Sequence, residues 1–192
     1  MLNTEEDVLV RASLMKDQLA FIRAHPRGEE LLDAMTPALV AEIDSSSRLA
    51  WIPGRTNFDT VAAVYDRFGL REGERFYFDA FLGAWDSPLL RAVVRGGLRV
   101  TGDDPGGLVK LLPRGTELVF RGFGALSLLE RSPGSAVLLR SDAPERCFER
   151  EAAWLHFEAA AQRSGISLTG RESQVQVEVD APARRAWFRL SW

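Results

Sequence analysis

Apolar residues recur with helical spacing in the first part of the chain and at every second position in the last part, with the change near Leu112. Spacings of three and four residues are typical of a helix that buries one face, whereas alternation is typical of a half-buried strand. The pattern predicts a helical lobe over residues 1–112 and a strand-rich lobe over residues 113–192. Because no long flexible linker separates the lobes, we expect a single domain.

The helical part contains several apolar stripes. They are formed by Leu31, Leu32, Met35 and Leu39, by Val61, Val64, Tyr65 and Phe68, by Phe76, Tyr77, Ala80, Phe81 and Trp85, and by Leu89, Leu90, Val93 and Val94. Residues that favour helix starts stand at Thr36-Pro37, at Asn57 or Asp59, at Ser87-Pro88 and at Asp104-Pro105. We expect Gly69 to end the second helix and the last helix to reach Leu112, with a loop or short extended piece at 45–55.

The second part of the chain predicts the order strand, strand, helix, strand, strand. The first two strands are expected at 116–131 and 136–140 around a turn at 132–135, and the last two at 173–180 and 186–192. Along the third strand, valines alternate with polar residues, which is typical of an antiparallel sheet with one packed face. The predicted fold class is α+β, a lobe of about five helices packed on a four-stranded antiparallel sheet with one packed helix.

The helix expected between the two hairpins, at 145–163, carries apolar residues on two faces. One stripe holds Phe148, Ala152, Leu155 and Ala159, and the nearly opposite side holds Ala153, Trp154, Phe157 and Ala161. A helix with two apolar faces needs two partners. One partner is expected to be the sheet, and the other is the helical lobe, a partner subunit or a ligand cavity.

Composition and charge narrow the function classes. The 192 residues include 24 basic and 27 acidic ones, a net charge of −3, so the chain has no basic footprint for nucleic acid. Its one cysteine, Cys147, excludes an internal disulfide framework, and the polar segment Met1–Asp7 is unlike a secretory signal. No apolar run approaches the length of a membrane span. We therefore expect a cytoplasmic protein that binds neither nucleic acid nor membranes.

The sequence offers little for metal or nucleophilic chemistry. His25 and His156 are far apart, and Cys147 lies on a different helix face from His156, so these groups form no chelating set. We expect Cys147 to be a buried small side chain, with a reactive exposed thiol as the alternative. We expect His156 to lie at the rim of its helix beside Glu149 and Arg163. Because no serine-nucleophile, zinc-protease or phosphate-loop motif is found, the prediction is a protein without metal or enzymatic activity.

Two features have both a functional and a purely structural interpretation. Arg91, Arg95 and Arg99 recur every four residues on one face of their predicted helix. They form either a contact for a phosphate, a carboxylate or an acidic partner, or a solvated face paired with acids. Trp187 lies on the strand face opposite Phe188, and either packs across strands or acts as an interface anchor.

Three stretches of the chain resemble a known family. They are the aromatic helix from Phe76 to Trp85, the helix start Ser87-Pro88-Leu89-Leu90-Arg91 and the closing strand from Ala186 to Trp192. With the order of strands, they resemble a family of paralogous myxobacterial proteins that end in a similar aromatic-Arg-aliphatic-Ser-Trp strand. The layout is also similar to the group of haem nitric-oxide-binding, four-vinyl-reductase-like and TRAPP-like domains. In that group the space between a helical lobe and an antiparallel sheet often holds a small molecule or supports association, so the resemblance implies a ligand-binding or scaffold domain.

The haem-binding pattern of that group is not matched. Its haem-binding members use an axial histidine in the helical lobe and a Tyr-x-Ser-x-Arg clamp for the propionates. The two tyrosines here begin Tyr65-Asp66-Arg67-Phe68-Gly69 and Tyr77-Phe78-Asp79-Ala80-Phe81, and neither fits. His25 precedes a proline in a predicted turn, and His156 lies on the late helix, outside the expected lobe. We therefore predict no cofactor.

Two hypotheses for function follow. The first is a non-enzymatic cytoplasmic ligand-binding or sensory domain with a mainly apolar cavity between lobe and sheet. Trp85, Trp154 and Phe157 would line it, and Arg91 or Arg95 would orient an acidic group of a small ligand. The second is an interaction adaptor in which the same apolar surface forms a homodimer or binds a signalling protein. A closed cavity would favour the first hypothesis, and a broad exposed apolar patch the second.

Overall fold

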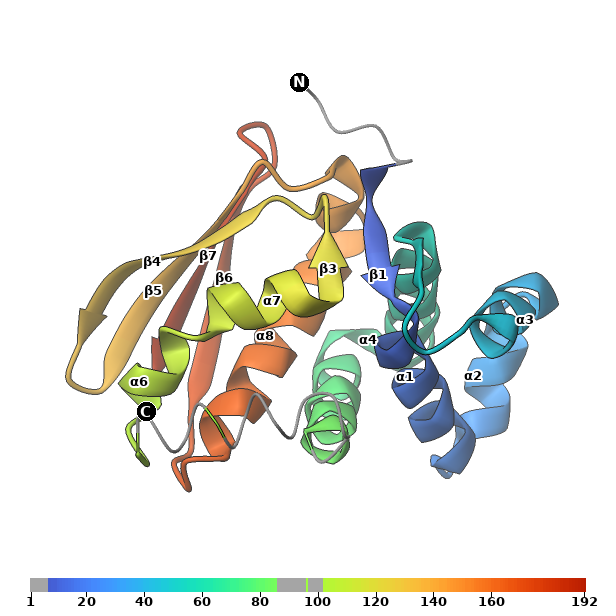
Figure 1. Ribbon diagram of the computed structural model, residues 1–192, viewed down its shortest axis with the longest axis horizontal. Helices are drawn as coiled ribbons and strands as arrows, with labels where there is room; N and C mark the ends of the chain where they lie inside the picture. Colours follow the sequence, from blue (N-terminus) through green and yellow to red (C-terminus); the bar gives the residue numbers. More distant parts are fainter. Residues whose placement is uncertain (1–6, 86–95, 97–101) are drawn as a thin grey trace.

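The computed structural model describes residues 7–85, 96 and 102–192, and its elements form three layers (Figure 1). The main sheet is the first layer, helix α8 (Ala153–Ser167) lies on its inner side, and the helices of the N-terminal lobe lie beyond α8. Helix α8 therefore lies between the lobe and the sheet.

The described helices of the N-terminal lobe are α1 (Ala12–Ala24), α2 (Gly28–Ala34), α3 (Pro37–Ser45) and α4 (Arg55–Ala84). Two short helices lead from the lobe to the sheet, α6 (Pro105–Val109) and α7 (Leu112–Val119). Two 3-10 turns precede α8, η2 (Glu145–Phe148) and η3 (Arg150–Ala152). The helix expected to begin at Ser87-Pro88 lies outside the described residues. The division of one domain into lobes 1–112 and 113–192 stays a prediction.

Two of the predicted helix starts are capped as expected. Thr36 Oγ1 accepts a hydrogen bond from the backbone N–H of Leu39 at 3.2 Å. The carboxylate of Asp104 accepts from the backbone N–H groups of Gly106 and Gly107 at 3.0 and 2.9 Å. The first N–H groups of a helix have no partner within it, so these side chains stabilise the starts of α3 and α6.

A small sheet connects the start of the chain to its middle. Strand β1 (Leu9–Arg11) pairs antiparallel with β2 (Trp51–Pro53) on one side and with β3 (Phe120–Arg121) on the other. The extended piece predicted at 45–55 is β2. Neither β1 nor this sheet was predicted, because strands of two or three residues are too short to show alternation.

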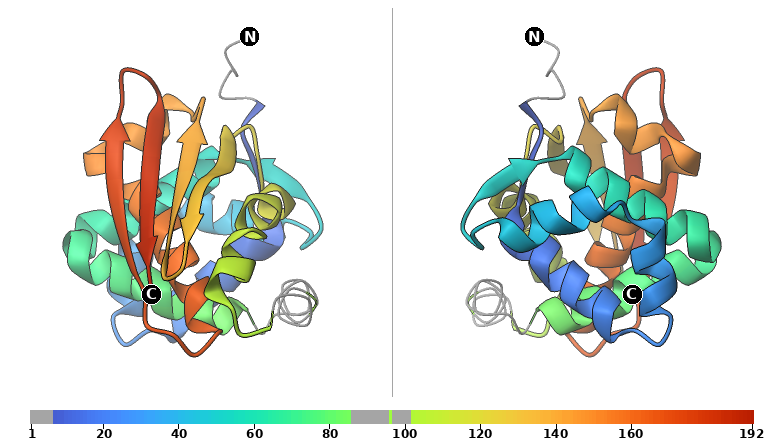
Figure 2. Two further views of the ribbon diagram at one scale, coloured as in Figure 1. Left: turned by 90° about the vertical axis from the view of Figure 1, so that its left-hand side faces the viewer. Right: turned by 90° about the vertical axis from the view of Figure 1, so that its right-hand side faces the viewer.

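The main antiparallel sheet consists, in spatial order, of β4 (Ala125–Ser132), β5 (Ser135–Ser141), β7 (Arg185–Ser191) and β6 (Gln174–Asp180). Its outer face is turned toward the reader in the left view of Figure 2, with no described helix in front of it. Leu138, Phe188 and Leu190 point inward and are buried. The α+β class and the order strand, strand, helix, strand, strand are therefore confirmed.

Two element boundaries were wrongly predicted around Pro113. The last lobe helix was expected to reach Leu112 and the first strand to begin at Thr116. Instead α6 ends at Val109, and Pro113 lies in the first turn of α7, so residues 116–119 are helical and β4 begins at Ala125. Because proline lacks only an N–H that the first turn leaves unpaired anyway, it starts a helix as readily as it ends one.

The helix predicted over 145–163 begins later and ends later. The chain makes two short 3-10 turns before α8 begins. In the second turn Arg150, Glu151 and Ala152 all have positive φ. The α-helix then continues to Ser167. Positive φ is costly for residues other than glycine, so the residue types Arg, Glu and Ala gave no indication of this backbone conformation.

Helix α4 differs from the prediction at its start and its middle. It begins at Arg55, not at Asn57 or Asp59, because the carbonyl of Gly54 already accepts the backbone N–H of Asn57 at 3.0 Å. Gly69, at φ 74° and ψ 176°, interrupts the helix, but a second helical stretch follows at once. Two predicted helices are therefore joined by a kink.

Candidate functional site

Helix α8 packs between two layers. Its Glu158 contacts Arg140 of the sheet, and its Trp154 and Phe157 contact Asn57 and Tyr77 of α4. Of the partners left open by the sequence for the second face, the structure places the helical lobe there. The junction of α4 and α8 is therefore the centre of the molecule.

Aromatic side chains fill this junction, and we call them the interlobe cluster. They are Phe58, Tyr77, Phe81, Phe120, Phe123, Trp154 and Phe157. Trp154 stacks on Phe123 with ring centroids 4.9 Å apart, and Phe157 meets Tyr77 edge to face at 4.8 Å. Such arrangements stabilise aromatic pairs beyond the burial of their surface. Burial also raises the pKa of the Tyr77 hydroxyl well above its usual value.

A buried hydrogen bond connects the cluster to α4. Trp154 Nε1 donates to Asn57 Oδ1 at 2.7 Å, and Asn57 is fully buried. Asn57 Nδ2 in turn lies 3.4 Å from the sulfur of Met15 on α1. Asn57 was predicted as a helix cap, but it lies inside α4 and makes these buried contacts instead.

One turn after Trp154, α8 is joined to the sheet by a buried ion pair. The guanidinium of Arg140 on β5 donates to both carboxylate oxygens of Glu158, and to the carbonyl of Gly124 at 3.2 Å. The side chains of Arg140 and Glu158 are 1% and 7% exposed, so the charges are held almost without water. Sequence reasoning missed this pair. The signal was a polar residue at an inward position of each element.

The predicted ligand residues fall into three groups. Trp154 and Phe157 lie together in the interlobe cluster and are almost fully buried. Trp85 lies at the end of α4, half-buried, 6.3 Å from the ring of Phe81 and with Nε1 donating to Ser164 Oγ at 3.0 Å. Arg91 and Arg95, like Arg99, lie outside the described residues.

Gly165 marks the place where the end of α4 meets α8 and the short helices. A methyl group added at Gly165 would lie 3.7 Å from Cζ2 of Trp85 and 3.9 Å from the side chains of Leu108 and Leu112. These surroundings of Gly165, which we call the niche, are in ordinary van der Waals contact and are apolar apart from the hydrogen bond between Trp85 and Ser164. It adjoins the interlobe cluster through Phe81, so it extends the site expected from the sequence.

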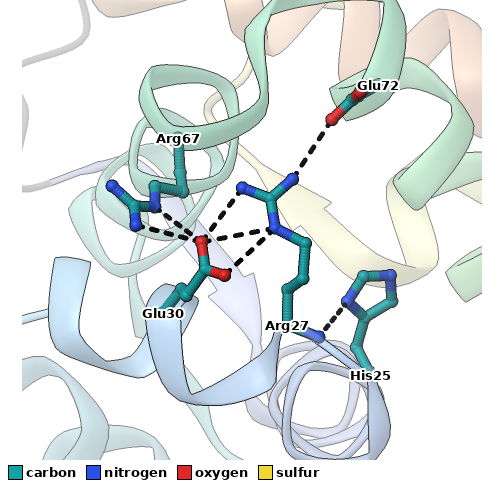
Figure 3. Close-up of polar contacts among 5 residues, drawn as sticks. All are labelled: His25, Arg27, Glu30, Arg67 and Glu72. Atoms are coloured by element: carbon teal, nitrogen blue, oxygen red, sulfur yellow. Dashed lines mark hydrogen bonds and ion pairs between the residues drawn. The ribbon is translucent and has the colours of Figure 1, made fainter.

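His25 lies in the turn between α1 and α2, beside a network of charged groups at the kink of α4 (Figure 3). Its Nδ1 accepts the backbone N–H of Arg27 at 3.2 Å. Glu30 accepts hydrogen bonds from Arg27 and Arg67, which hold the pKa of its carboxyl below the usual value, and Arg27 also reaches Glu72 at 3.3 Å. The network therefore ties α2 to both sides of the kink.

The other titratable candidates are held by structural contacts. His156 Nδ1 lies 2.6 Å from Glu74 Oε1, so it connects α8 to the second half of α4 at the rim of the interface. Cys147 is fully buried, and burial raises the pKa of its thiol well above the usual value. A neutral, buried thiol is a poor nucleophile, as expected for a packing residue.

Spaces among the described residues differ greatly in size. A cavity of about 10 Å³ lies between α1 and α4 beside the buried amide of Gln18, which is room for at most one water. A much larger open groove of roughly 1170 Å³ lies at the start of strand β6, and we call it the β6 groove. Residues that line it include Phe78, Arg163, Arg171, Glu172, Gln174 and Gln176.

Comparison with known proteins identifies the fold. No family model and no curated relative matches this sequence. The structure of the Fe(II) unliganded H-NOX protein from K. algicida has a TM-score of 0.65, with 8% identity over 94% of this chain and 95% of that chain. The fold is that of an H-NOX domain. A Cs H-NOX mutant shares the H-NOX fold with a TM-score of 0.56, 12% identity, and coverage of 94% and 95%. H-NOX denotes haem nitric oxide/oxygen binding.

The residues of this chain do not fit a haem held in the manner of that group. The chain has only two histidines. His25 packs among Phe68 and Phe76, with ring centroids 5.6 and 5.2 Å away, and His156 is paired with Glu74. The interlobe cluster fills the described part of the junction with aromatic rings. The H-NOX-like fold is therefore present without the Tyr-x-Ser-x-Arg clamp, and with both histidines engaged in contacts within the protein.

The described residues contain neither a group of side chains that could hold a metal ion nor a helix that could span a membrane. There, no three histidine, cysteine, aspartate or glutamate side chains gather closely enough to hold a metal ion. Within 7–85, 96 and 102–192, no helix is both long enough and apolar enough to cross a membrane.

Proposed function

We propose that this chain is a non-enzymatic sensory or ligand-binding domain that uses the H-NOX-like fold without haem. The observation that carries the proposal is the double attachment of α8, by Trp154 to Asn57 of α4 and by Glu158 to Arg140 of the sheet. A ligand that shifts the lobe against α8 would therefore also act on the sheet. Differential contact with two arrangements is what a sensor requires.

The proposed ligand site extends from the interlobe cluster to the niche at Gly165. Half-buried Trp85 would supply its accessible apolar surface, and the hydroxyl of Ser164 its nearest polar group. Trp154 and Phe157 would join this surface when the lobe shifts against α8. Arg91 or Arg95 would bind an acidic group of the ligand. The expected occupant is a small apolar or weakly acidic molecule, because a mainly apolar lining with few polar groups binds such compounds.

Native mass spectrometry of the purified full chain tests this proposal. We expect an added mass that disappears when the protein is denatured. Trp85→Ala should remove that mass, because it deletes the half-buried wall of the niche. Trp187→Ala, on the outer face of the sheet, is the matched control and should retain it. A native spectrum of the bare monomer would contradict the proposal.

Independence from haem has its own test. Addition of haemin to the full chain should give no sharp Soret band beyond that of free haemin, since the chain lacks the propionate clamp and aromatic rings occupy the described junction. A sharp band that is lost in His25→Ala or His156→Ala would overturn this part of the proposal.

The second candidate function is a protein-interaction module or homodimer. It is favoured by the outer face of the sheet, where half-buried Trp187 lies opposite Leu139 and no described helix covers either. A dimer without added mass in the native spectrum would favour this candidate. We also propose that the chain is related to the myxobacterial paralogues, because it has a similar closing strand. We further propose that it is cytoplasmic.

A further inference from the structure

We propose that the free edge of strand β6 and the β6 groove beside it bind an extended acidic peptide segment of a partner protein as an added strand. This inference deepens the second candidate function. It does not depend on a ligand between the lobes. Its evidence comes from the sheet edge, the shape of the groove and the charges that line it.

The two edges of the main sheet differ in how well they are protected. Strand β4, at one edge, shifts register between Leu128 and Glu130 and has α6 and α7 packed beside it. Strand β6, at the other edge, pairs with β7 without a register shift over all of Gln174–Asp180. Bulges and covering helices are the usual protection of an edge against further pairing. Helix α8 packs on the inner face of β6, but β6 has no bulge and no described strand pairs with its outer side, so the backbone groups there are open to another strand.

The groove lies at the start of this edge. Residues 170–176, which include the first three residues of β6, line it without interruption, together with Phe78 of α4, Arg163 of α8 and residues 191–192 at the end of β7. Its volume of roughly 1170 Å³ exceeds the range of about 300–1,000 Å³ that is typical of small-molecule pockets. An open groove beside a strand whose outer edge has no described strand partner suits an extended chain better than a compact ligand.

The charges in the groove favour an acidic chain. Arg163 and Arg171 have no acidic side-chain partner among the described residues, and the lining contains one acidic side chain, that of Glu172. On the neighbouring strand, Arg189 is by contrast paired with Glu178. Arg163 is also positioned, because its guanidinium lies 4.6 Å over the ring of Phe78. Two unpaired arginines beside a strand edge are placed to bind carboxylate side chains of the added strand.

The first test measures binding of a fluorescein-labelled peptide of alternating glutamate and threonine to the full chain by fluorescence anisotropy. Arg163→Gln and Arg171→Gln should each weaken binding about fivefold or more, since each removes a charged hydrogen bond. Glu172→Gln should strengthen binding, a gain that misfolding cannot produce. Arg114→Gln, an exposed arginine on α7, is the matched control and should change nothing. Equal affinity in all variants would overturn the site.

The second test separates strand addition from simple charge attraction. A peptide with the same side chains but alternate N-methylated amides keeps its charge and cannot pair with a strand edge. It should bind at least tenfold more weakly, and only the unmodified peptide should slow hydrogen exchange across residues 174–180. Equal binding of both peptides would overturn strand addition. Because neither readout involves the interlobe ligand, failure here leaves the native-mass test of that ligand unaffected.

Discussion

Trp154 and Glu158 lie one turn apart on α8, yet each makes a buried polar contact with a different layer. Trp154 reaches Asn57 of the lobe, and Glu158 reaches Arg140 of the sheet. Buried polar groups cost free energy unless they are paired. The position of α8 is therefore specified by directional contacts as well as by its apolar surface, and single substitutions can test each side separately.

Trp154→Phe should lower the free energy of unfolding by at least about 1–3 kcal/mol, because it leaves the buried Oδ1 of Asn57 without its donor. Urea unfolding followed by circular dichroism measures the change. Trp187→Phe is the control. Because Trp187 is half-buried on the outer sheet face, this substitution should lower the free energy of unfolding by about 0.5 kcal/mol or less. Equal losses in the two variants would contradict a specific role for the Trp154 hydrogen bond.

Glu158→Gln should destabilise the protein by about 3–5 kcal/mol, because the buried charge of Arg140 loses its counter-charge while the shape is kept. The same urea unfolding experiment applies. Glu178→Gln breaks the exposed pair with Arg189 and should have a much smaller effect. Adding Arg140→Met to Glu158→Gln should restore part of the lost stability. A double variant no more stable than Glu158→Gln would show that the unpaired charge is not the cause.

At the scale of elements, the kink of α4 lets one continuous segment serve two neighbours. Before Gly69 the helix packs with the lobe and carries Asn57, and after it Tyr77 and Phe81 contact α8. Glu30 of α2 contacts Arg67 before the kink, and Arg27, just before α2, contacts Glu72 after it. The bend is thus part of the architecture that brings lobe and sheet together.

Gly69→Ala should destabilise the protein by about 1–3 kcal/mol, because φ 74° with ψ 176° is a conformation almost restricted to glycine. An added Cβ would meet no atom within 4 Å, so the cost comes from the backbone alone. Gly83→Ala, in the same helix and equally open, is the matched control. It should stabilise by about 0.5–1 kcal/mol. Thermal unfolding that shows the same sign for both variants would contradict the assigned role of Gly69.

At the scale of the whole molecule, exposed carboxylates form ion pairs with arginines on neighbouring elements. Hydrogen bonds from arginines lower the pKa of Glu30, of Asp44 and of Glu178 below their usual values. The unfolded chain therefore takes up protons at a higher pH than the folded one. The stability that these groups add is present above their ordinary pKa values and is lost as the pH falls below about 4.5.

We therefore expect the free energy of unfolding to fall steadily from about pH 4.5 downward. Urea midpoints measured at a series of pH values follow this change. A triple variant with Glu30→Gln, Asp44→Asn and Glu178→Gln should show a shallower decline, because fewer groups take up extra protons on unfolding. An unchanged slope in the triple variant would show that other carboxylates are responsible.

Much of the architecture follows from patterns within single segments. The alternation in β6 and β7 predicts a half-packed antiparallel sheet, and the two apolar faces of the helix before them predict a middle layer. Caps such as Thr36 and Asp104 act within a few residues, so they are readable from local sequence. The boundaries near Pro113 and at Arg150–Ala152 were missed because local signals there allow more than one conformation.

The sequence by itself determined the α+β class, the order of elements and the absence of a haem-ligand pattern, because these depend on residue spacing and residue inventory. Tertiary structure alone decided that α4 covers the second face of α8, that Arg140 meets Glu158, and that Arg163 and Arg171 share one groove. Such contacts join segments far apart along the chain, and periodicity carries no information about which distant segment supplies the partner.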